Sequence, residues 1–477
     1  MRKTKIICTL GPASRDEKTI KALLKNGMNV ARINMSHNEL PYHEETITRF
    51  RKIRDELKVP AAIMMDTRGP EIRIKKFTNE SVTIKEGDTF TLTTKDVAGD
   101  ENIVSITYPN LPKELSKGTS VLIDDGRIEL EVTECTKTDI VCKVIYGGEI
   151  SGNKGINIPH VSLNLEYLSE RDKEDLLFGI SQDVDFIAAS FVRSKDDVVA
   201  LRRFLNYHGA HDIRIISKIE SIEAVDNFDE ILNHSDGIMI ARGDMGVEVE
   251  FEKLPGLQKR FIKSCYQSGK MVITATQMLE SMIKNTSPTR AEITDVANAI
   301  FDGTSAIMLS GETAVGDNPV LVVKVMSKIA RQAEQDAFAM KMYEDFDYLT
   351  DYSDNTNAIC DAAKTTANDL NAKAIIVVTK SGRSARRMSK FRPKIPIVAS
   401  TPVTKTYHQL SLSWGVYPTL SLYQKTSEDL FLHAIDCAEE LNIVKQGDCV
   451  VITAGLPLAT TGNTNMLKVE IVGGIEN

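Results

Sequence analysis

The sequence predicts a (β/α)8 barrel, or TIM barrel, with a small inserted β-barrel lid domain and a C-terminal α/β domain. Short runs rich in apolar and β-branched residues alternate with helix-like segments over the first part of the chain. Such alternation is typical of a parallel sheet covered by helices. Eight runs before residue 310 favour a closed barrel, in which functional residues lie at the carboxyl ends of the strands.

The expected barrel strands have short apolar cores, and most of them end in polar or charged residues. They are residues 5–10, 29–35, 61–66, 185–191, 213–220, 237–242, 271–276 and 306–309. Helices are expected at residues 17–26, 40–57, 196–207, 252–268 and 291–301, and the glycines just past helix ends suit left-handed caps, at Gly27, Gly209, Gly269 and Gly303. An open doubly wound sheet is the alternative. It is disfavoured because no Gly-x-Gly-x-x-Gly turn follows the first strand.

An inserted β domain is expected between the third and fourth barrel strands. From about Glu71 to Pro159 the helical period disappears, and alternating stretches separated by Gly and Asp turns replace it. Strands are expected at residues 81–84, 89–93, 120–123, 128–134 and 140–145. This assigns 71–158 to the inserted domain, with 1–70 and 159–340 forming the barrel. A domain held on two stems above the barrel mouth is placed to act as a lid.

A third domain, 341–477, is expected after an acidic connector at residues 334–357. Strands at 374–379, 397–400, 449–453 and 466–471 alternate with helices at 358–370, 385–391 and 428–441. This order predicts a compact α/β layer.

Composition narrows the class of protein. The net charge of −8 is spread over the chain, so no basic face indicates a nucleic-acid partner. No apolar run is long enough to cross a membrane. The first expected strand starts at Lys5, which leaves no room for a secretory signal, and the seven cysteines lack Cys-x-x-Cys spacing. We therefore expect a cytoplasmic protein with reduced thiols.

The most informative motifs end the fifth and sixth expected strands. The first reads Ile-Ile-Ser-Lys218-Ile-Glu220, and the second Ile-Met-Ile-Ala-Arg-Gly-Asp244. Neighbouring barrel strands would bring one ammonium and two carboxylates into one small volume. That set suits a divalent cation that holds an anionic substrate, with Lys218 neutralising charge that develops during reaction. The alternative is a pair of core strands whose charges face water.

The second and third strands carry further polar groups. Arg32, if buried, requires an anion, which suggests recognition of phosphate or carboxylate. Neutral and acidic oxygens follow at the same rim, from Asn34, Ser36, Asp66 and Thr67. Two alternatives remain open here. Asn34, Ser36 and His37 could cap the following helix, and Arg73 could form a structural salt bridge with Glu71.

Hydroxyl groups end the last two strands, at Thr276 and Ser310. A hydroxyl at this position can orient water or relay a proton, and it can equally cap a helix. The sequence leaves both interpretations open.

Taken together, these motifs resemble the pyruvate kinase family over essentially the full length. Residues 213–225 fit the family's active-site pattern throughout. Further matches are Gly-Pro-Glu-Ile-Arg at 69–73, Ala-Arg-Gly-Asp at 241–244, Ala-Thr-Gln-Met-Leu-Glu-Ser-Met at 275–282 and Leu-Ser-Gly-Glu-Thr-Ala at 309–314. The resemblance is to bacterial-type members without the extra C-terminal domain. Their fold is a barrel with an inserted β domain and a C-terminal α/β domain.

The resemblance implies transfer of a phosphoryl group from phosphoenolpyruvate to ADP, giving pyruvate and ATP. Glu220 and Asp244 would hold Mg²⁺ or Mn²⁺, and Lys218 would stabilise the phosphoryl group in flight and the enolate. The residues implied in substrate contact also include Arg32, Gly243 and Thr276. The catalytic set comprises Lys218, Thr276, Arg32, Arg73 and Ser310, with Thr276 and Ser310 in the region that protonates the enolate.

The resemblance also implies a K⁺ site and a nucleotide site. The potassium ligands would be Asn34, Ser36, Asp66 and Thr67. Glu71 is typical of potassium-dependent members, whereas potassium-independent members carry lysine there. Arg68 departs from the commoner lysine and is expected to leave the site intact. The nucleotide contacts would be Asn34, Ser36, His37, Arg73 and Lys154, with Asp125 as a further partner for the nucleotide's metal.

The resemblance alone implies that the chain assembles as a homotetramer.

A second phosphate site is suggested in the third domain. The strand-to-helix turn that could cradle phosphate comprises Thr379, Lys380, Ser381, Gly382, Arg383 and Ser384. An ordinary turn is the alternative. The later loop at 454–461 lacks the tryptophan and arginine that help to bind fructose 1,6-bisphosphate in eukaryotic members. AMP or a sugar monophosphate is therefore an alternative effector.

Two rival functions remain. A barrel aldolase could form a Schiff base on Lys218, but two nearby acids would keep that amine protonated and oppose imine formation. A catalytically silent relative that senses a metabolite is the other rival. It is disfavoured because each implied catalytic position is intact.

Overall fold

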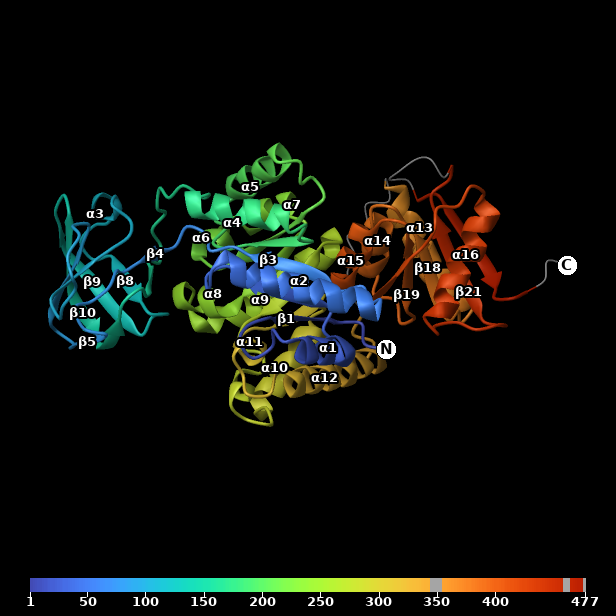
Figure 1. The fold of residues 1–477 in the computed structure, drawn as a ribbon, viewed down its shortest axis with the longest axis horizontal. Helices are drawn as coiled ribbons and strands as arrows, with labels where there is room; N and C mark the ends of the chain where they lie inside the picture. Colours follow the sequence, from blue (N-terminus) through green and yellow to red (C-terminus); the bar gives the residue numbers. More distant parts are fainter. Residues whose placement is uncertain (344–353, 458–463, 475–477) are drawn as a thin grey trace.

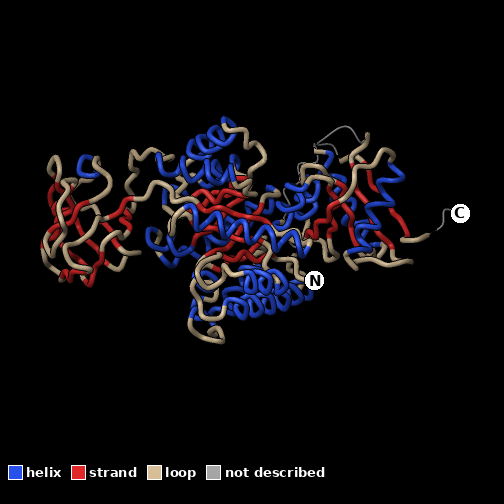
Figure 2. Tube along the Cα trace, in the orientation of Figure 1, coloured by secondary structure: helices blue, strands red, loops and turns tan. Residues whose placement is uncertain are grey.

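The computed structural model describes residues 1–343, 354–457 and 464–474. The molecule is elongated, with a β domain, a central barrel and an α/β domain arranged along its long axis (Figure 1). Strands form the centre of the barrel and of the C-terminal domain, and helices lie outside them (Figure 2).

The central domain is a closed parallel barrel of eight strands, as predicted. The strands follow the order β1-β17-β16-β15-β14-β13-β3-β2 around the barrel. Their bounds are β1 Lys5–Thr9, β2 Val30–Asn34, β3 Ala62–Asp66, β13 Phe186–Ala189, β14 Arg214–Ile219, β15 Gly237–Ala241, β16 Met271–Ala275 and β17 Ala306–Leu309. Each strand is one to three residues shorter than expected at one or both ends, except the last. The polar residues that follow are therefore free to turn toward the mouth.

Helices surround the barrel and bury their apolar faces against it (Figure 1). They are α1 Glu17–Asn26, α2 Leu40–Leu57, α4 Glu170–Ser181, α5 Lys195–Tyr207, α6 Ile222–Asp226, α7 Phe228–His234, α8 Arg242–Glu248, α9 Leu254–Ser268, α10 Arg290–Phe301, α11 Gly311–Ala314 and α12 Pro319–Ala339. The four predicted cap glycines all have positive φ, at 123° for Gly27, 77° for Gly209, 67° for Gly269 and 97° for Gly303. Over the described residues, we find no helix with the length and apolar character needed to span a membrane.

The inserted domain is a small β barrel with its own apolar core. Seven strands follow the order β4-β12-β8-β9-β10-β6-β7, and β5 pairs separately with β11. The two outer strands meet, because Lys75 N donates to Ser105 O at 2.7 Å and Thr107 N donates to Arg73 O at 2.9 Å. The bounds are β4 Ile72–Arg73, β5 Ser81–Ile84, β6 Thr89–Thr93, β7 Ile103–Ser105, β8 Ser120–Ile123, β9 Ile128–Cys135, β10 Asp139–Tyr146, β11 Gly148–Ser151 and β12 Gly155–Asn157, with helix α3 at Leu111–Glu114.

The C-terminal domain is a five-stranded sheet between helices. The strand order is β20-β19-β18-β21-β22, with only β22 antiparallel to its neighbour. Separate apolar clusters line the two faces, one beneath α13 and α14 and the other beneath α16. The bounds are β18 Ala374–Val378, β19 Ile397–Thr401, β20 Val416–Leu420, β21 Cys449–Ala454, β22 Met466–Ile471, α13 Asn355–Asp369, α14 Arg383–Lys390, α15 Thr404–Gln409, η3 Leu410–Leu412 and α16 Ser427–Glu440.

The prediction that an acidic connector begins at residue 334 is wrong. Helix α12 continues to Ala339, so residues 334–339 are helical. Glu334 is buried, and its carboxylate accepts hydrogen bonds from Lys3 N and Thr4 N. Its charge therefore ties the chain start to α12 instead of facing solvent. Residues 344–353 of the connector lie outside the described residues.

The C-terminal domain closes the amino end of the barrel. Gln409 Nε2 donates to Asp185 O at 3.1 Å and to Asp212 O at 2.8 Å, just before β13 and β14 begin. Leu412 of η3 is fully buried in the apolar cluster that fills the barrel interior. The opposite, carboxyl end of the barrel is the end that faces the β domain.

Candidate active site

Lys218, Glu220 and Asp244 come together at the carboxyl end of the barrel. Strand β14 ends at Ile219, so Lys218 lies on the strand and Glu220 directly follows it. Strand β15 ends at Ala241, and helix α8 begins at once. Asp244 therefore lies in the first turn of α8, where the amino end of a helix favours a carboxylate.

The Lys218 ammonium is enclosed by three oxygen atoms. Its Nζ lies 2.8 Å from Ser190 Oγ, 3.2 Å from Asp66 Oδ1 and 2.9 Å from Glu220 Oε1. Burial lowers the pKa of Lys218, but Asp66, Glu220 and Asp244 outweigh this and raise it above its ordinary value. The amine is therefore a fixed positive charge at neutral pH.

Glu220 is placed to bind a divalent cation together with Asp244. It is 2 % exposed, and its Oε2 accepts a hydrogen bond from Phe191 N at 2.6 Å. Burial raises the pKa of Glu220, Lys218 opposes the rise and Asp244 adds to it, and together they bring the pKa to about 7. A cation between the two carboxylates would relieve their repulsion, and an all-oxygen donor set suits Mg²⁺.

The protein alone offers this cation few ligands. Within the described ranges, no group of three or more His, Cys, Asp or Glu side chains could hold a metal. Mg²⁺ characteristically uses one or two carboxylates and completes its shell with waters and phosphate oxygens. Glu220 and Asp244 fit that pattern.

Arg32 finds its anion within the protein. Its Nε donates to Asp66 Oδ2 at 2.6 Å, and its Nη1 donates to Thr9 Oγ1 at 2.9 Å. Burial raises the pKa of Asp66, but Arg32 and Lys218 outweigh it and hold the pKa below its usual value. One buried carboxylate thus links the two cations that the sequence placed on separate strands.

The four predicted potassium ligands lie at the ends of the adjacent strands β2 and β3. Asn34 and Asp66 stand opposite each other in the parallel register. Asn34 Oδ1 accepts from Ser36 N at 3.1 Å, and Thr67 Oγ1 accepts from Ser190 N at 3.1 Å. All four side chains supply oxygen, which suits a hard monovalent or divalent cation.

The alternative of a helix cap is not realised at this rim. Helix α2 has Glu39 as its N-cap residue, and no side chain caps it. Asn34 and Ser36 bond each other instead, and His37 is exposed. None of these three side chains therefore caps helix α2.

Thr276 occupies a strained turn after β16. Its φ is 66°, and that of Gln277 is 54°, in the left-handed region that residues with a side chain rarely adopt. Gly243 N donates to Thr276 Oγ1 at 2.8 Å. Arg242 holds the turn from below, because its Nη2 donates to Thr276 O at 2.7 Å. The strained turn thus fixes the hydroxyl beside the first turn of α8.

Ser310 lies at the same mouth but does not cap a helix. It precedes the short helix α11, where its side chain makes no cap hydrogen bond. Its backbone N–H donates to the buried carboxylate of Glu312 at 2.7 Å. A cleft of about 510 Å³ has Gly243, Asp244, Thr276 and Ser310 among its lining residues.

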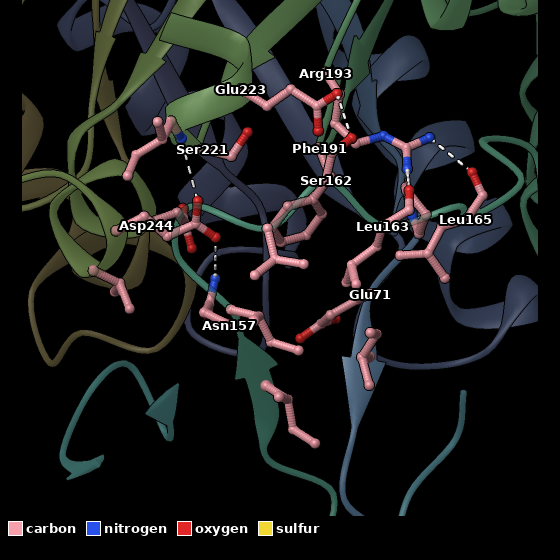
Figure 3. Close-up of a pocket in the computed structure, with 18 of the residues that line it drawn as sticks. Glu71, Asn157, Ser162, Leu163, Leu165, Phe191, Arg193, Ser221, Glu223 and Asp244 are labelled. Atoms are coloured by element: carbon pink, nitrogen blue, oxygen red, sulfur yellow. Dashed lines mark hydrogen bonds between the residues drawn. The ribbon is translucent and has the colours of Figure 1, made fainter. Parts of the chain in front are cut away.

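A second cavity of about 480 Å³ lies beneath the β domain, with Glu71 and Asp125 among its lining residues. The predicted nucleotide contacts Arg73 and Lys154 do not line it. Figure 3 shows this cavity with Glu71, Asn157 and Asp244 around it. Arg73 pairs with Glu71 at 2.6 Å, so the proposed salt bridge is present. Lys154 Nζ lies 2.8 Å from Asp124 Oδ1, and Asp125 lines both cavities.

Comparison with known proteins decides the family. The family described as "Pyruvate kinase, barrel domain" matches residues 1–323, and "Pyruvate kinase, alpha/beta domain" matches residues 357–470. The chain belongs to the pyruvate kinase family.

Curated relatives agree over nearly the whole chain. The pyruvate kinase of Clostridium perfringens is 45% identical over 98% of this chain and 100% of its own length. That of Clostridium acetobutylicum is 44% identical, over 99% of this chain and 100% of its own. The pyruvate kinase of Staphylococcus haemolyticus is 45% identical over 99% of this chain but only 81% of its own length.

Three residues at this pyruvate kinase family site were missed in the sequence. Ser190 bridges Lys218 and Asp66, Phe191 supplies the N–H bound by Glu220, and Arg242 supports Thr276. Ser190 and Phe191 directly follow β13. The rule that barrel chemistry lies after each strand would have found them.

The predicted effector loop connects β18 to α14. Gly382 has φ 74° and is the N-cap residue, and its N–H donates to Thr379 Oγ1 at 3.1 Å. Arg383 pairs with Asp354 at 2.8 Å, and Ser384 bonds Thr464. Lys380 lies over the Tyr423 ring, and Ser381 O accepts a hydrogen bond from Arg386 at 3.0 Å. Of the later loop at 454–461, residues 458–461 lie outside the described residues.

Proposed function

We infer that this chain is a glycolytic phosphotransferase that transfers the phosphoryl group of phosphoenolpyruvate to ADP, giving pyruvate and ATP. Membership of the pyruvate kinase family supports this reaction. The observation that carries it is the pairing of a permanently charged Lys218 with two carboxylates at the barrel mouth. Phosphoryl transfer depends on positioning and counter-charge, which this arrangement provides.

Each residue of the site has a proposed task. Glu220 and Asp244 would hold Mg²⁺ or Mn²⁺, which when bound neutralises charge on the substrate's phosphoryl and carboxylate oxygens. Lys218 would stabilise the phosphoryl group in flight and then the enolate oxygen. The carboxylate of phosphoenolpyruvate would lie against Gly243 and Thr276, which hydrogen-bond each other at 2.8 Å and both line the cleft.

The enolate requires a proton after transfer. Thr276 and Ser310 line one cleft with Asp244, so either hydroxyl, with ordered water, is placed to deliver it. The strained backbone at Thr276 supports a functional role for this residue, because such strain persists where the surroundings enforce it.

The phosphates of both substrates would meet Arg32 and Arg73. Arg32 is fixed by Asp66 on the barrel rim, and Arg73 lies on the first strand of the lid. Lid closure would bring Arg73 and Lys154 toward the nucleotide, with Asn34, Ser36 and His37 contacting it from the barrel.

We propose K⁺ as a second cation, held by Asn34, Ser36, Asp66 and Thr67. Their adjacent strand ends and oxygen donors support this set.

We also propose the boundaries 1–70 and 159–340 for the barrel, 71–158 for the lid and 341–477 for the regulatory domain. A homotetramer, a phosphorylated effector at residues 379–384 and a cytoplasmic location complete the proposal.

A coupled assay of ATP formation tests the function directly. ATP should form from phosphoenolpyruvate and ADP when Mg²⁺ and K⁺ are present. Adding fructose 1,6-bisphosphate, AMP or a sugar monophosphate would identify the effector. An aldolase would instead leave a borohydride-reducible pyruvoyl adduct on Lys218, which its raised pKa opposes.

A further inference from the structure

A single carboxylate connects the lid to both segments that carry the proposed metal ligands. Glu248 Oε1 accepts a hydrogen bond from Asn157 Nδ2 at 3.2 Å, and its Oε2 accepts one from Ile222 N at 3.2 Å. Asn157 ends strand β12 at the return stem of the lid, and Ile222 begins helix α6. Three elements, β12, α6 and α8, therefore meet at one side chain.

The two ends of this contact lie next to the proposed metal ligands. Ile222 is two residues after Glu220, and the segment between them is a short turn into α6. Glu248 is four residues after Asp244 on α8, so both side chains lie on the same face of that helix. Asp244 and Glu248 both line the cavity beneath the lid.

We propose that Glu248 is a positioning residue that sets the spacing of Glu220 and Asp244 and couples it to the return stem of the lid. The proposal rests on the inferred assignment of Glu220 and Asp244 as metal ligands. Glu248 is not one of the proposed metal ligands; it acts by holding α6 against α8. Partners of metal ligands commonly change metal affinity by roughly 10–100-fold when they are removed.

The chain offers a matched control on the same stem. Ser162 Oγ donates to Glu223 Oε1 at 3.1 Å, which ties the stem to α6 without involving α8. Ser162 is exposed, so its removal should not disturb the core. If any stem contact sufficed, Ser162→Ala and Glu248→Ala would behave alike.

The experiment measures Mn²⁺ binding to the full-length protein without substrate, by electron paramagnetic resonance. Glu248→Ala should weaken Mn²⁺ binding by about 10-fold or more. Glu248→Gln should stay close to wild type, because its Oε1 can accept from Ile222 N while its Nε2 donates to Asn157 Oδ1 once the Asn157 amide turns over. Ser162→Ala should also stay close to wild type. Unchanged affinity in Glu248→Ala, or equal losses in the Ala and Gln variants, would overturn the positioning role.

A second measurement tests the coupling between the metal ligands and the return stem of the lid. It also keeps the proposal testable if Glu248→Ala does not fold. Mn²⁺ should slow amide hydrogen exchange in strand β12 of the wild type and of Ser162→Ala. In Asn157→Ala, which lacks the lid's half of the contact, that slowing should be lost. Its persistence in Asn157→Ala would refute the coupling. Both readouts are independent of turnover, so failure of the wild type to form ATP would separately reject the inferred function.

Discussion

The Nζ of Lys218 lies 2.9 Å from Oε1 of Glu220, and both side chains are almost completely buried. A buried ion pair is expensive unless further partners satisfy it. Here Ser190 and Asp66 complete the shell of the ammonium, and Phe191 N donates to the carboxylate. The arrangement keeps a charged amine and a proposed metal ligand in contact before substrate binds, which is the preorganisation that electrostatic catalysis requires.

Lys218→Met should abolish most phosphoryl transfer while leaving phosphoenolpyruvate binding measurable. Removing one preorganised charge stabiliser commonly lowers kcat by roughly 10²–10³-fold. The measurement is steady-state ATP formation together with binding of phosphoenolpyruvate by isothermal titration. Lys263→Met, at an exposed position on α9, should retain activity. Undiminished turnover in Lys218→Met would remove this residue from the mechanism.

Activity should depend on K⁺ and collapse when tetramethylammonium replaces it, because the large ion cannot enter a site of four oxygen donors. Glu71→Lys should restore part of the activity without K⁺, since the lysine supplies a positive charge near Asp244, which interacts electrostatically with Glu71. Glu80→Lys, at an exposed lid position, is the control and should not restore it. Full rate of the wild type in potassium-free buffer would contradict the potassium site.

Leu412→Ala should lower the stability of the barrel, although Leu412 belongs to the C-terminal domain. Its side chain is fully buried within the cluster that fills the barrel floor. A buried Leu→Ala change typically costs about 2–5 kcal/mol, because a cavity remains. Calorimetry should show a lower Tm for the barrel transition. Leu432→Ala, at a side chain 63% exposed, should leave it unchanged, and equal effects in both variants would argue against the docking role.

His408 should make stability depend on pH in a defined window. Burial, together with the nearby charge of Arg54, lowers the pKa of His408 to about 4. The unfolded chain, with a pKa near 6.5, binds the proton more readily, so stability falls as pH decreases from about 6.5 toward 4. Urea unfolding across this range should give a flatter profile for His408→Gln than for the wild type. The exposed His211→Gln should keep the wild-type slope, and a wild-type slope in His408→Gln would exclude this origin.

The sequence predicted the barrel well because each strand is a short apolar run that ends in polar residues. It missed strands where that signal is weak. Strand β20 contains Pro418, which an edge strand tolerates because its N–H side need not pair. Strands β4 and β12 have two and three residues, too few to show alternation, yet they form the lid stems.

The sequence predicted which residues form the candidate site better than it predicted the contacts between them. The sequence indicated that Arg32 needs an anion but not that Asp66 supplies it, since that contact joins separate strands. The hydrogen bonds of Ser190 depend on three strand ends meeting at once. The extension of α12 over residues 334–339 was missed because buried Glu334 looks like a solvent-facing acid until its backbone donors are known.

Anomalous diffraction from a crystal soaked in Mn²⁺ tests the central claim most directly. The account predicts a peak between the carboxylates of Glu220 and Asp244, with the Lys218 ammonium beside it. A peak at another place in the protein, or these three side chains pointing away from the ion, would contradict the proposed site and the reaction built on it.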